Sequence, residues 1–170
     1  MKINYSLQNL IDKYKADYIN SFSDKVEKDI HNLSNHVLQC WKKDKNIFII
    51  GNGGSGANAQ HIANDFLYGI AKKTGAGLKV QALSANQSVV TCLANDVGYD
   101  YIFSEQLAVL AEPGDLLVAL SGSGNSPNIV RVLEQANLMG VKSCAILGYK
   151  GGQSKSLADL SIHFPVDDMQ

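Results

Sequence analysis

The apolar and polar positions from residue 46 onwards alternate between two periods. Short apolar runs of about five residues are typical of buried parallel strands, and the segments between them have the spacing of amphipathic helices. The strands are predicted at 46–50, 78–83, 116–120, 143–147 and 160–164, and the helices at 57–71, 86–95, 100–111 and 127–139. Strands that alternate with helices predict an α/β fold, in which helices cover both faces of a parallel sheet.

A helical arm precedes this core. Apolar side chains recur at helical spacing over 5–22 and again over 26–41, and Ser23 and Asp24 between them suit a break and a new helix cap. We therefore expect a single domain over 1–170, with N-terminal helices in 1–45 and the α/β core in 46–170. An arm this apolar predicts packing against a partner subunit, although it can also fold onto its own sheet.

Composition limits the classes of function. The chain has 170 residues, 18% of them charged, and a formal net charge of −1, so it has no general attraction for nucleic acid or membrane. No apolar stretch approaches the roughly 20 residues that span a bilayer, and the N-terminus lacks the apolar segment of a signal peptide. Cys40, Cys92 and Cys144 are odd in number and widely spaced, which predicts buried thiols in a reducing compartment. We expect a cytoplasmic protein.

Two loops rich in glycine and serine follow the first and third predicted strands. The first has the sequence GNGGSG at 51–56, and the second has SGSGNSP at 121–127. Both lie at the carboxyl ends of strands, where ligands bind in parallel sheets. Each leads into a predicted helix, so backbone N–H groups and a positive helix end are available to a phosphate. The second loop adds three hydroxyls and an asparagine amide but no acid, which predicts a site for an anionic, hydroxylated small molecule.

The first loop also matches the spacing G-x-G-x-x-G of dinucleotide-binding folds. Such a site requires an acid at the end of the following strand, where it holds the ribose. The second predicted strand is followed instead by Ser84, Ala85 and Asn86. We therefore expect no nucleotide cofactor.

Polar side chains on the helix after the first loop form one stripe. Asn58, His61, Asp65 and Tyr68 are three and four residues apart and separate from the apolar face. His61 and Asp65 can act as acid and base or hold a metal between them, but an ordinary solvated helix face has the same spacing. Two interpretations are also open for Asp96: it lies at the end of a predicted helix, and its carboxylate could bind sugar hydroxyls.

Together these motifs resemble the sugar isomerase (SIS) superfamily. The resemblance rests on GNGGS at 51–55, His61, AND at 94–96 and SGSGNS at 121–126, and it extends from about Ile30 to the end of the chain. It is strongest for the phosphoheptose isomerase branch. It implies a five-stranded parallel sheet between helices, a homotetramer with active sites at subunit interfaces, and the aldose–ketose isomerisation of a sugar phosphate.

The resemblance also implies roles for individual residues. Asp65 and His61 would carry the catalysis through an enediol, and the same pair would hold a zinc ion. Three serines of the second loop and Ser55 would bind the phosphate, Asn52 would lie near the sugar, and Gly122 would offer its backbone N–H. The expected substrate-binding residues are Asn52, Gly53, Ser55, Asp96, Ser121, Gly122, Ser123, Asn125 and Ser126.

This sequence departs from the family pattern in three places. Asp65 stands where the heptose isomerases have a glutamate, and Gly122 stands where they usually have a threonine. The family also continues past the turn at Asp167–Asp168 into a helix that supplies a glutamine and a histidine, and we expect the chain printed here to lack that helix.

The expected function is the conversion of sedoheptulose 7-phosphate to a heptose 7-phosphate, in lipopolysaccharide or capsule biosynthesis. The alternative is a non-catalytic SIS-fold protein that binds a sugar phosphate or a protein partner as a regulator.

Overall fold

A parallel sheet forms the centre of the molecule. The structure, a computed structural model, describes residues 6–167, so residue 5 of the predicted first helix and Asp168 of the expected turn lie outside it. Within residues 6–167 the sheet has five parallel strands in the order β2-β1-β3-β4-β5. They are β1 (Asn46–Gly51), β2 (Lys79–Ala82), β3 (Leu116–Ser121), β4 (Lys142–Leu147) and β5 (Leu160–His163). All five predicted strands are confirmed.

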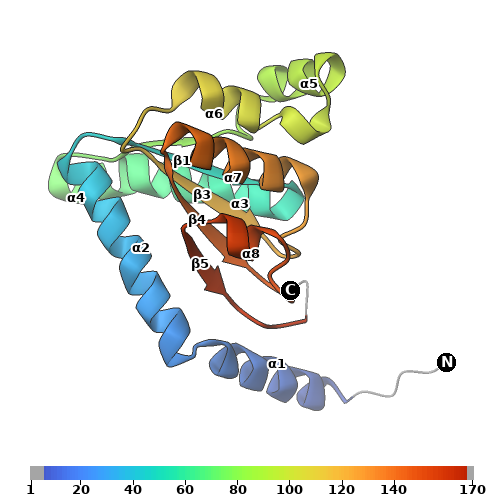
Figure 1. Ribbon diagram of the computed structural model, residues 1–170. Helices are drawn as coiled ribbons and strands as arrows, with labels where there is room; N and C mark the ends of the chain where they lie inside the picture. Colours follow the sequence, from blue (N-terminus) through green and yellow to red (C-terminus); the bar gives the residue numbers. More distant parts are fainter. Residues whose placement is uncertain (1–5, 168–170) are drawn as a thin grey trace.

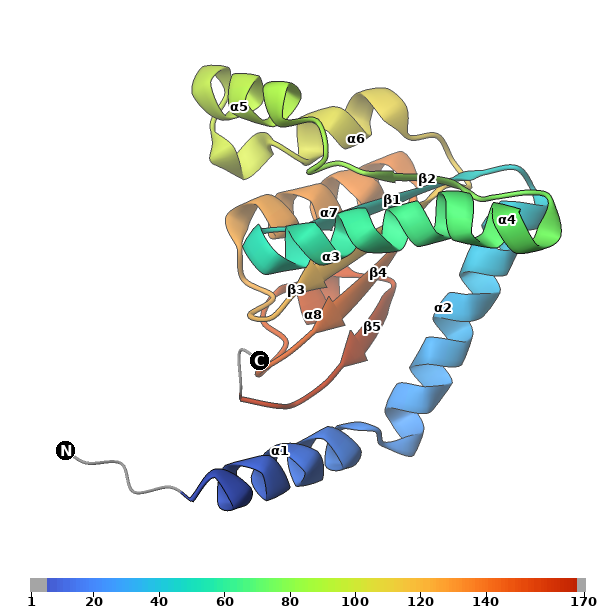
Figure 2. The same ribbon diagram turned by 180° about the vertical axis from the view of Figure 1, so that it is seen from behind.

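Helices cover both faces of the sheet (Figures 1 and 2). Alternate residues of β1 point to opposite faces, because Ile47 and Ile49 belong to one buried cluster and Phe48 and Ile50 to another. The first cluster packs against α2 (Asp24–Lys42), α3 (Gly53–Asn64) and α4 (Ile70–Thr74). The second packs against α5 (Gln87–Asp96), α6 (Ser104–Leu110), α7 (Pro127–Met139) and α8 (Ser154–Leu157). The predicted α/β class is therefore correct.

The strand order brings the two glycine- and serine-rich loops together. β2, the next strand along the chain, pairs with one edge of β1, whereas β3 pairs with the opposite edge. Gly51, at the end of β1, is in register with Leu120, one residue before the end of β3. Loops that diverge from neighbouring strands in this way leave a crevice where ligands bind in parallel sheets.

Two of the predicted helices differ in detail. The helix predicted at 57–71 begins earlier, at Gly53, inside the glycine loop. A Cβ at Gly56 would lie only 2.8 Å from the Gly51 carbonyl oxygen, so this turn of the helix packs closely on the end of β1. A π-helical turn, η1 (Asp65–Gly69), then separates α3 from α4. The helix predicted at 100–111 is a 3₁₀ turn, η2 (Tyr99–Tyr101), followed by α6.

The N-terminal arm consists of α1 (Leu7–Ser21) and α2, as predicted. Ser23 caps α2, and its Oγ accepts the Val26 N–H at 3.4 Å. α1 lies apart from the sheet (Figure 1), and the rings of Phe22 and Phe164 meet edge to face between the arm and the segment after β5. Among residues 6–167, no helix is both long and apolar enough to cross a bilayer.

The prediction that all three cysteines are buried is wrong for Cys92. Cys40 and Cys144 are buried, and burial raises the pKa of the Cys144 thiol to about 12. Cys92 is exposed, because α5 packs on the core through Val90, Leu93 and Ala94 and turns its other side to solvent.

Candidate functional site

The loop after β3, residues 121–126, is organised by its own serine hydroxyls. Ser121 Oγ accepts the Gly124 N–H at 3.1 Å, and Ser123 Oγ accepts the Asn125 N–H at 3.2 Å. Because each oxygen accepts from the backbone, its hydroxyl hydrogen is oriented away from that N–H and can donate to a ligand. Ser126 occupies the N-cap position of α7 as predicted, but its side chain makes no capping bond. Pro127 has no N–H and the Ile129 N–H donates to the Ser126 carbonyl at 3.0 Å, so the first turn keeps the Asn128 N–H for an anion.

The loop of residues 121–126, called the anion loop below, is held in place by hydrogen bonds from the segment after β4. The Ser154 N–H and hydroxyl both donate to the Gly124 carbonyl, at 2.9 and 2.8 Å. Gly124 has φ +65°, and a Cβ there would lie 2.0 Å from the Gly151 carbonyl oxygen, so only glycine fits. The Gln153 N–H donates to Asn125 Oδ1 at 2.9 Å, so the Asn125 amide nitrogen is the end left to a ligand.

The glycine loop after β1 is tied to α7 through its asparagine. Asn52 is the N-cap residue of α3 but makes no side-chain cap bond. Its Nδ2 donates to Asn128 Oδ1 at 2.9 Å, and Asn128 Nδ2 donates back to Asn52 Oδ1 at 2.8 Å. Tyr99 adds a third bond to Asn52 Oδ1, at 3.1 Å. Asn128 and Tyr99 were not predicted from the sequence motifs, although Asn128 directly follows the second loop motif.

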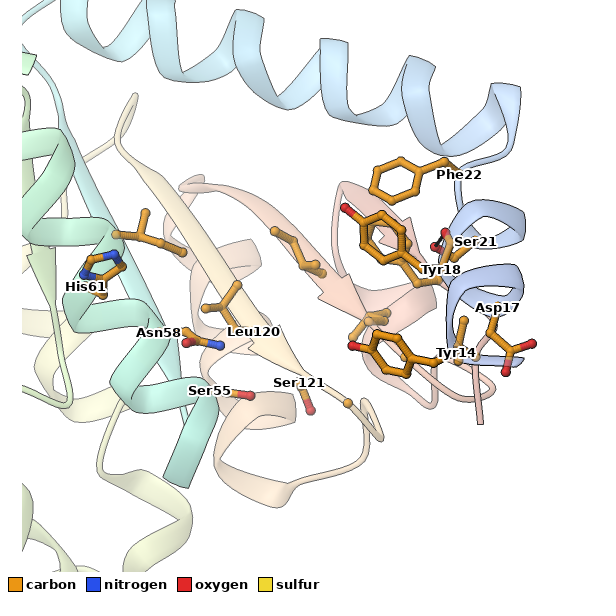
Figure 3. A pocket seen from close by; sticks show the side chains of 17 residues that line it. Tyr14, Asp17, Tyr18, Ser21, Phe22, Ser55, Asn58, His61, Leu120 and Ser121 are labelled. Carbon is orange, nitrogen blue, oxygen red and sulfur yellow. Dashed lines mark hydrogen bonds between the residues drawn. The ribbon is translucent and has the colours of Figure 1, made fainter. Parts of the chain in front are cut away.

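A cavity of about 650 Å³ opens between these loops and the N-terminal arm (Figure 3). Ser55 and Ser121 approach it from the two loops, and Asn58 and His61 line it from α3. The opposite wall comes from α1 and the residue after it, and comprises Tyr14, Asp17, Tyr18, Ser21 and Phe22. The cavity therefore has serine hydroxyls from both loops at one end and side chains of the arm along the opposite wall.

The predicted site residues do not all share this cavity. Gly122 lines it with Ser55, whereas Asn52 and Gly53 line a smaller cavity of about 270 Å³ on the other side of the glycine loop. Asp96 borders neither of these two cavities. It lies exposed at the end of α5, where its carboxylate accepts hydrogen bonds from Cys92 Sγ and Asn95 Nδ2. Ser123, Asn125 and Ser126 also line neither, and they belong to the anion loop itself.

His61 and Asp65 lie one turn apart at the end of α3. His61 Nε2 is 3.5 Å from Asp65 Oδ2, and their side chains are 75% and 58% exposed. The π-helical turn begins at Asp65, whose carbonyl accepts the Ile70 N–H five residues on. Turns of this kind are rare and often occur at functional sites. His61 lines the cavity, whereas Asp65 is not one of its lining residues and presents its exposed carboxylate beside His61.

The pair has the donor atoms of half a zinc site. An imidazole nitrogen and a carboxylate oxygen are both ordinary zinc ligands, but a structural zinc takes four ligands and a catalytic zinc three from the protein. Residues 6–167 contain no group of three histidine, cysteine, aspartate or glutamate side chains placed to hold a metal ion. The described residues alone therefore do not fit a zinc ion.

Comparisons with known proteins identify the relatives of this chain. Residues 13–148 match the SIS domain family. A curated phosphoheptose isomerase from Trichlorobacter lovleyi is 35% identical over 95% of this chain and 84% of its own length. The solved phosphoheptose isomerase of Neisseria gonorrhoeae is 30% identical, with a TM-score of 0.83 over 96% of this chain and 89% of the other. That of Francisella tularensis is 25% identical, with a TM-score of 0.85 over 97% and 89%.

Proposed function

This chain belongs to the SIS domain family, and we propose that it is an enzyme that interconverts sedoheptulose 7-phosphate and an aldose heptose 7-phosphate. One observation supports this most strongly: the interlocked anion loop of residues 121–126, in a chain whose relatives are phosphoheptose isomerases. Those relatives do not favour the non-catalytic regulator considered above.

The phosphate anchors the substrate in this account. The hydroxyls of Ser121 and Ser123, the backbone N–H of Gly122 and the N-terminus of α7 supply donors, and the loop itself contains no acid. Binding energy from a phosphate several atoms away from the reacting carbons can be used to orient those carbons. Ser55, across the cavity, completes the phosphate site.

Proton transfer between C1 and C2 interconverts the two sugars. Asp65 takes a proton from C1 of the ketose while His61 gives one to O2, which forms the enediol; Asp65 then returns a proton to C2 while His61 takes the proton from O1, which forms the aldehyde. His61, within 3.5 Å of that carboxylate, polarises the C2 carbonyl and exchanges a proton with its oxygen. Asp96 contacts a sugar hydroxyl when the substrate is bound.

Zinc belongs to the proposal only in part. His61 and Asp65 would be two of its ligands, and the others would come from outside residues 6–167. A metal there would polarise the substrate carbonyl. No step above depends on it.

The assembly and the cellular setting are also proposals. Exposed apolar side chains on α1, such as Leu7 at 72% and Ile19 at 70%, favour a homotetramer in which this arm is covered. The free thiols of Cys40 and Cys144 suit the cytoplasm. The product would serve lipopolysaccharide or capsule biosynthesis. Light scattering at micromolar concentration tests the assembly, and a stable monomer would refute it.

A turnover assay tests the function. The full chain is incubated with sedoheptulose 7-phosphate, and formation of the aldose is followed with and without a chelator. We expect aldose to accumulate to an equilibrium mixture. Binding of the sugar phosphate without any aldose would refute the isomerase proposal and leave a binding protein. Loss of turnover with chelator would support the zinc proposal, and unchanged turnover would refute it.

A further inference from the structure

We propose that Asn128 and Tyr99 are positioning residues, which hold the glycine loop in a fixed place relative to the anion loop through the side chain of Asn52. The inference rests on the proposed isomerase function. It concerns side chains that do not touch the substrate in this account and that the sequence motifs did not predict.

The geometry of the asparagine pair is reciprocal. Each amide donates to the other, at 2.9 and 2.8 Å, so the two side chains form a closed pair between the start of α3 and the first turn of α7. Asn128 is 1% exposed, so this pair is shielded from water at one end. Shielded amides are costly to leave unpaired, which makes the pair a strong constraint on the distance between the two helix ends.

Asn52 has nearly exhausted its hydrogen-bonding capacity. Its Oδ1 accepts from Asn128 and from Tyr99, and its Nδ2 has one hydrogen remaining after donating to Asn128. An asparagine at an N-cap normally accepts from the next helical turn, but here it makes no such bond. The side chain thus fastens α3 to α7 instead of capping α3, which leaves the N-terminal N–H groups of α3 without a side-chain partner.

The same contact extends to η2. Tyr99 reaches Asn52 from the first residue of η2, and the guanidinium of Arg131 stacks on Tyr101 at 4.5 Å from the ring centroid. Arg131 is one turn after Asn128 on α7. Arg131 contacts η2 directly, and Asn128 is linked to it through Asn52. The segment that follows Asp96 is thereby fixed to the same helix end as the anion loop.

Fixing both loops to one helix end matters for the proton transfer. The anion loop sets the position of the phosphate, while the glycine loop begins the helix that carries His61 and Asp65. A shift of about 1 Å between them would misplace the carboxylate relative to C1, which can lower the rate on the order of 10²-fold. The phosphate contacts would survive such a shift, so the effect should fall on kcat and not on KM.

The test uses three variants of the full chain with sedoheptulose 7-phosphate as substrate. Asn128→Ala should lower kcat on the order of 10²-fold and change KM less than about threefold. Tyr99→Phe removes only one hydroxyl from a residue that is 54% exposed, and should lower kcat about three- to tenfold. Asn137→Ala is the control, because it removes a side-chain bond from the far end of α7, to Leu157 O, and should leave both constants unchanged.

A second readout separates this inference from the function itself. Hydrogen exchange of the backbone amides of residues 53–56 should accelerate in Asn128→Ala and not in Asn137→Ala. A wild-type protein without turnover would refute the isomerase proposal, and hydrogen exchange alone would then test the positioning role. Faster exchange in Asn128→Ala would support that role, and unchanged exchange would overturn it. With an active wild type, a kcat within twofold for Asn128→Ala overturns it. If Asn128→Ala does not fold, Tyr99→Phe tests the positioning role, and an unchanged kcat in that variant would overturn it.

Discussion

The anion loop and the His61–Asp65 pair each contribute to the wall of the same cavity, through Ser121 and His61, but they are built very differently. The anion loop is held by serine hydroxyls, by the loop after β4 and by close glycine contacts, so few other residues fit there. The His61–Asp65 pair consists of two exposed side chains one helical turn apart, with His61 Nε2 3.5 Å from Asp65 Oδ2. Phosphate binding therefore depends on a rigid structure, whereas proton transfer depends on where two side chains lie.

This difference explains why the two regions should respond differently to substitution. A change at Gly124, where the backbone of the anion loop meets Gly151, should disturb packing and affinity together. A change in the His61–Asp65 pair should lower the rate of proton transfer while the fold and the phosphate contacts persist. The substitutions below test that separation.

Asp65→Asn should have the largest effect. It removes the proposed base and should lower kcat roughly 10²- to 10⁴-fold, while the affinity for sedoheptulose 7-phosphate stays within about twofold. Steady-state kinetics and calorimetry measure the two quantities. Asp44→Asn is a matched control on the exposed surface, where the carboxylate pairs with Lys79 far from the cavity. Full activity in Asp65→Asn would mean that the base lies elsewhere.

Gly124→Ala should affect folding and binding together. A Cβ at φ +65° would lie 2.0 Å from the Gly151 carbonyl, so strain and overlap should reduce the free energy of unfolding by roughly 2–5 kcal/mol. Gly140→Ala is the matched control, because Gly140 has φ +67° and no atom within 4 Å of the added Cβ. Urea denaturation should show a smaller loss for Gly140→Ala, with unchanged affinity. Equal losses in both variants would argue against the interlocked loop.

Asp65→Glu should raise activity. The aspartate side chain is shorter than the glutamate of the family by one carbon–carbon bond, about 1.5 Å, and a misplacement of about 1 Å can cost on the order of 10²-fold in rate. An increase in kcat of up to about 10²-fold is therefore expected in the full chain. A lower kcat would indicate that the backbone at the π-helical turn already compensates for the shorter side chain.

Ser123→Ala should have the smallest effect of the four. It removes one hydroxyl bond to a charged group, worth roughly 1.5–3 kcal/mol, so the affinity for the sugar phosphate should fall about tenfold or more. The melting temperature without ligand should change little, because Ser123 is exposed and its hydroxyl accepts only the Asn125 N–H among the described residues. Unchanged affinity by calorimetry would remove Ser123 from the phosphate site.

The sequence predicted the fold well because its signals are local. Buried strands have a continuous apolar pattern, and Ser126 with Pro127 marks the start of α7 where the structure places it. The π-helical turn at Asp65 has no such signal, since it interrupts a regular apolar period without a glycine or proline at its start. The early start of α3, at Gly53, lies within the glycine loop, where there are no apolar side chains to show a helical period.

The site could be predicted only in part for a related reason. Local motifs predicted the serines and the glycine loop. The bond between Asn52 and Asn128 joins residues 76 positions apart, and the bond between Asn125 and Gln153 joins residues 28 apart. Such pairs depend on the strand order, so the sequence named Asn52 and Asn125 as ligand-binding residues without showing that their side chains also hold the loops.

One measurement tests the central claim most directly. Wild-type protein and sedoheptulose 7-phosphate are brought to equilibrium in D₂O, and both sugars are examined by NMR. The account predicts that an aldose forms and that deuterium appears at C1 of the ketose or C2 of the aldose, because the enediol exchanges its proton through a carboxylate open to solvent. An aldose without deuterium in either sugar, or no aldose at all, would contradict it.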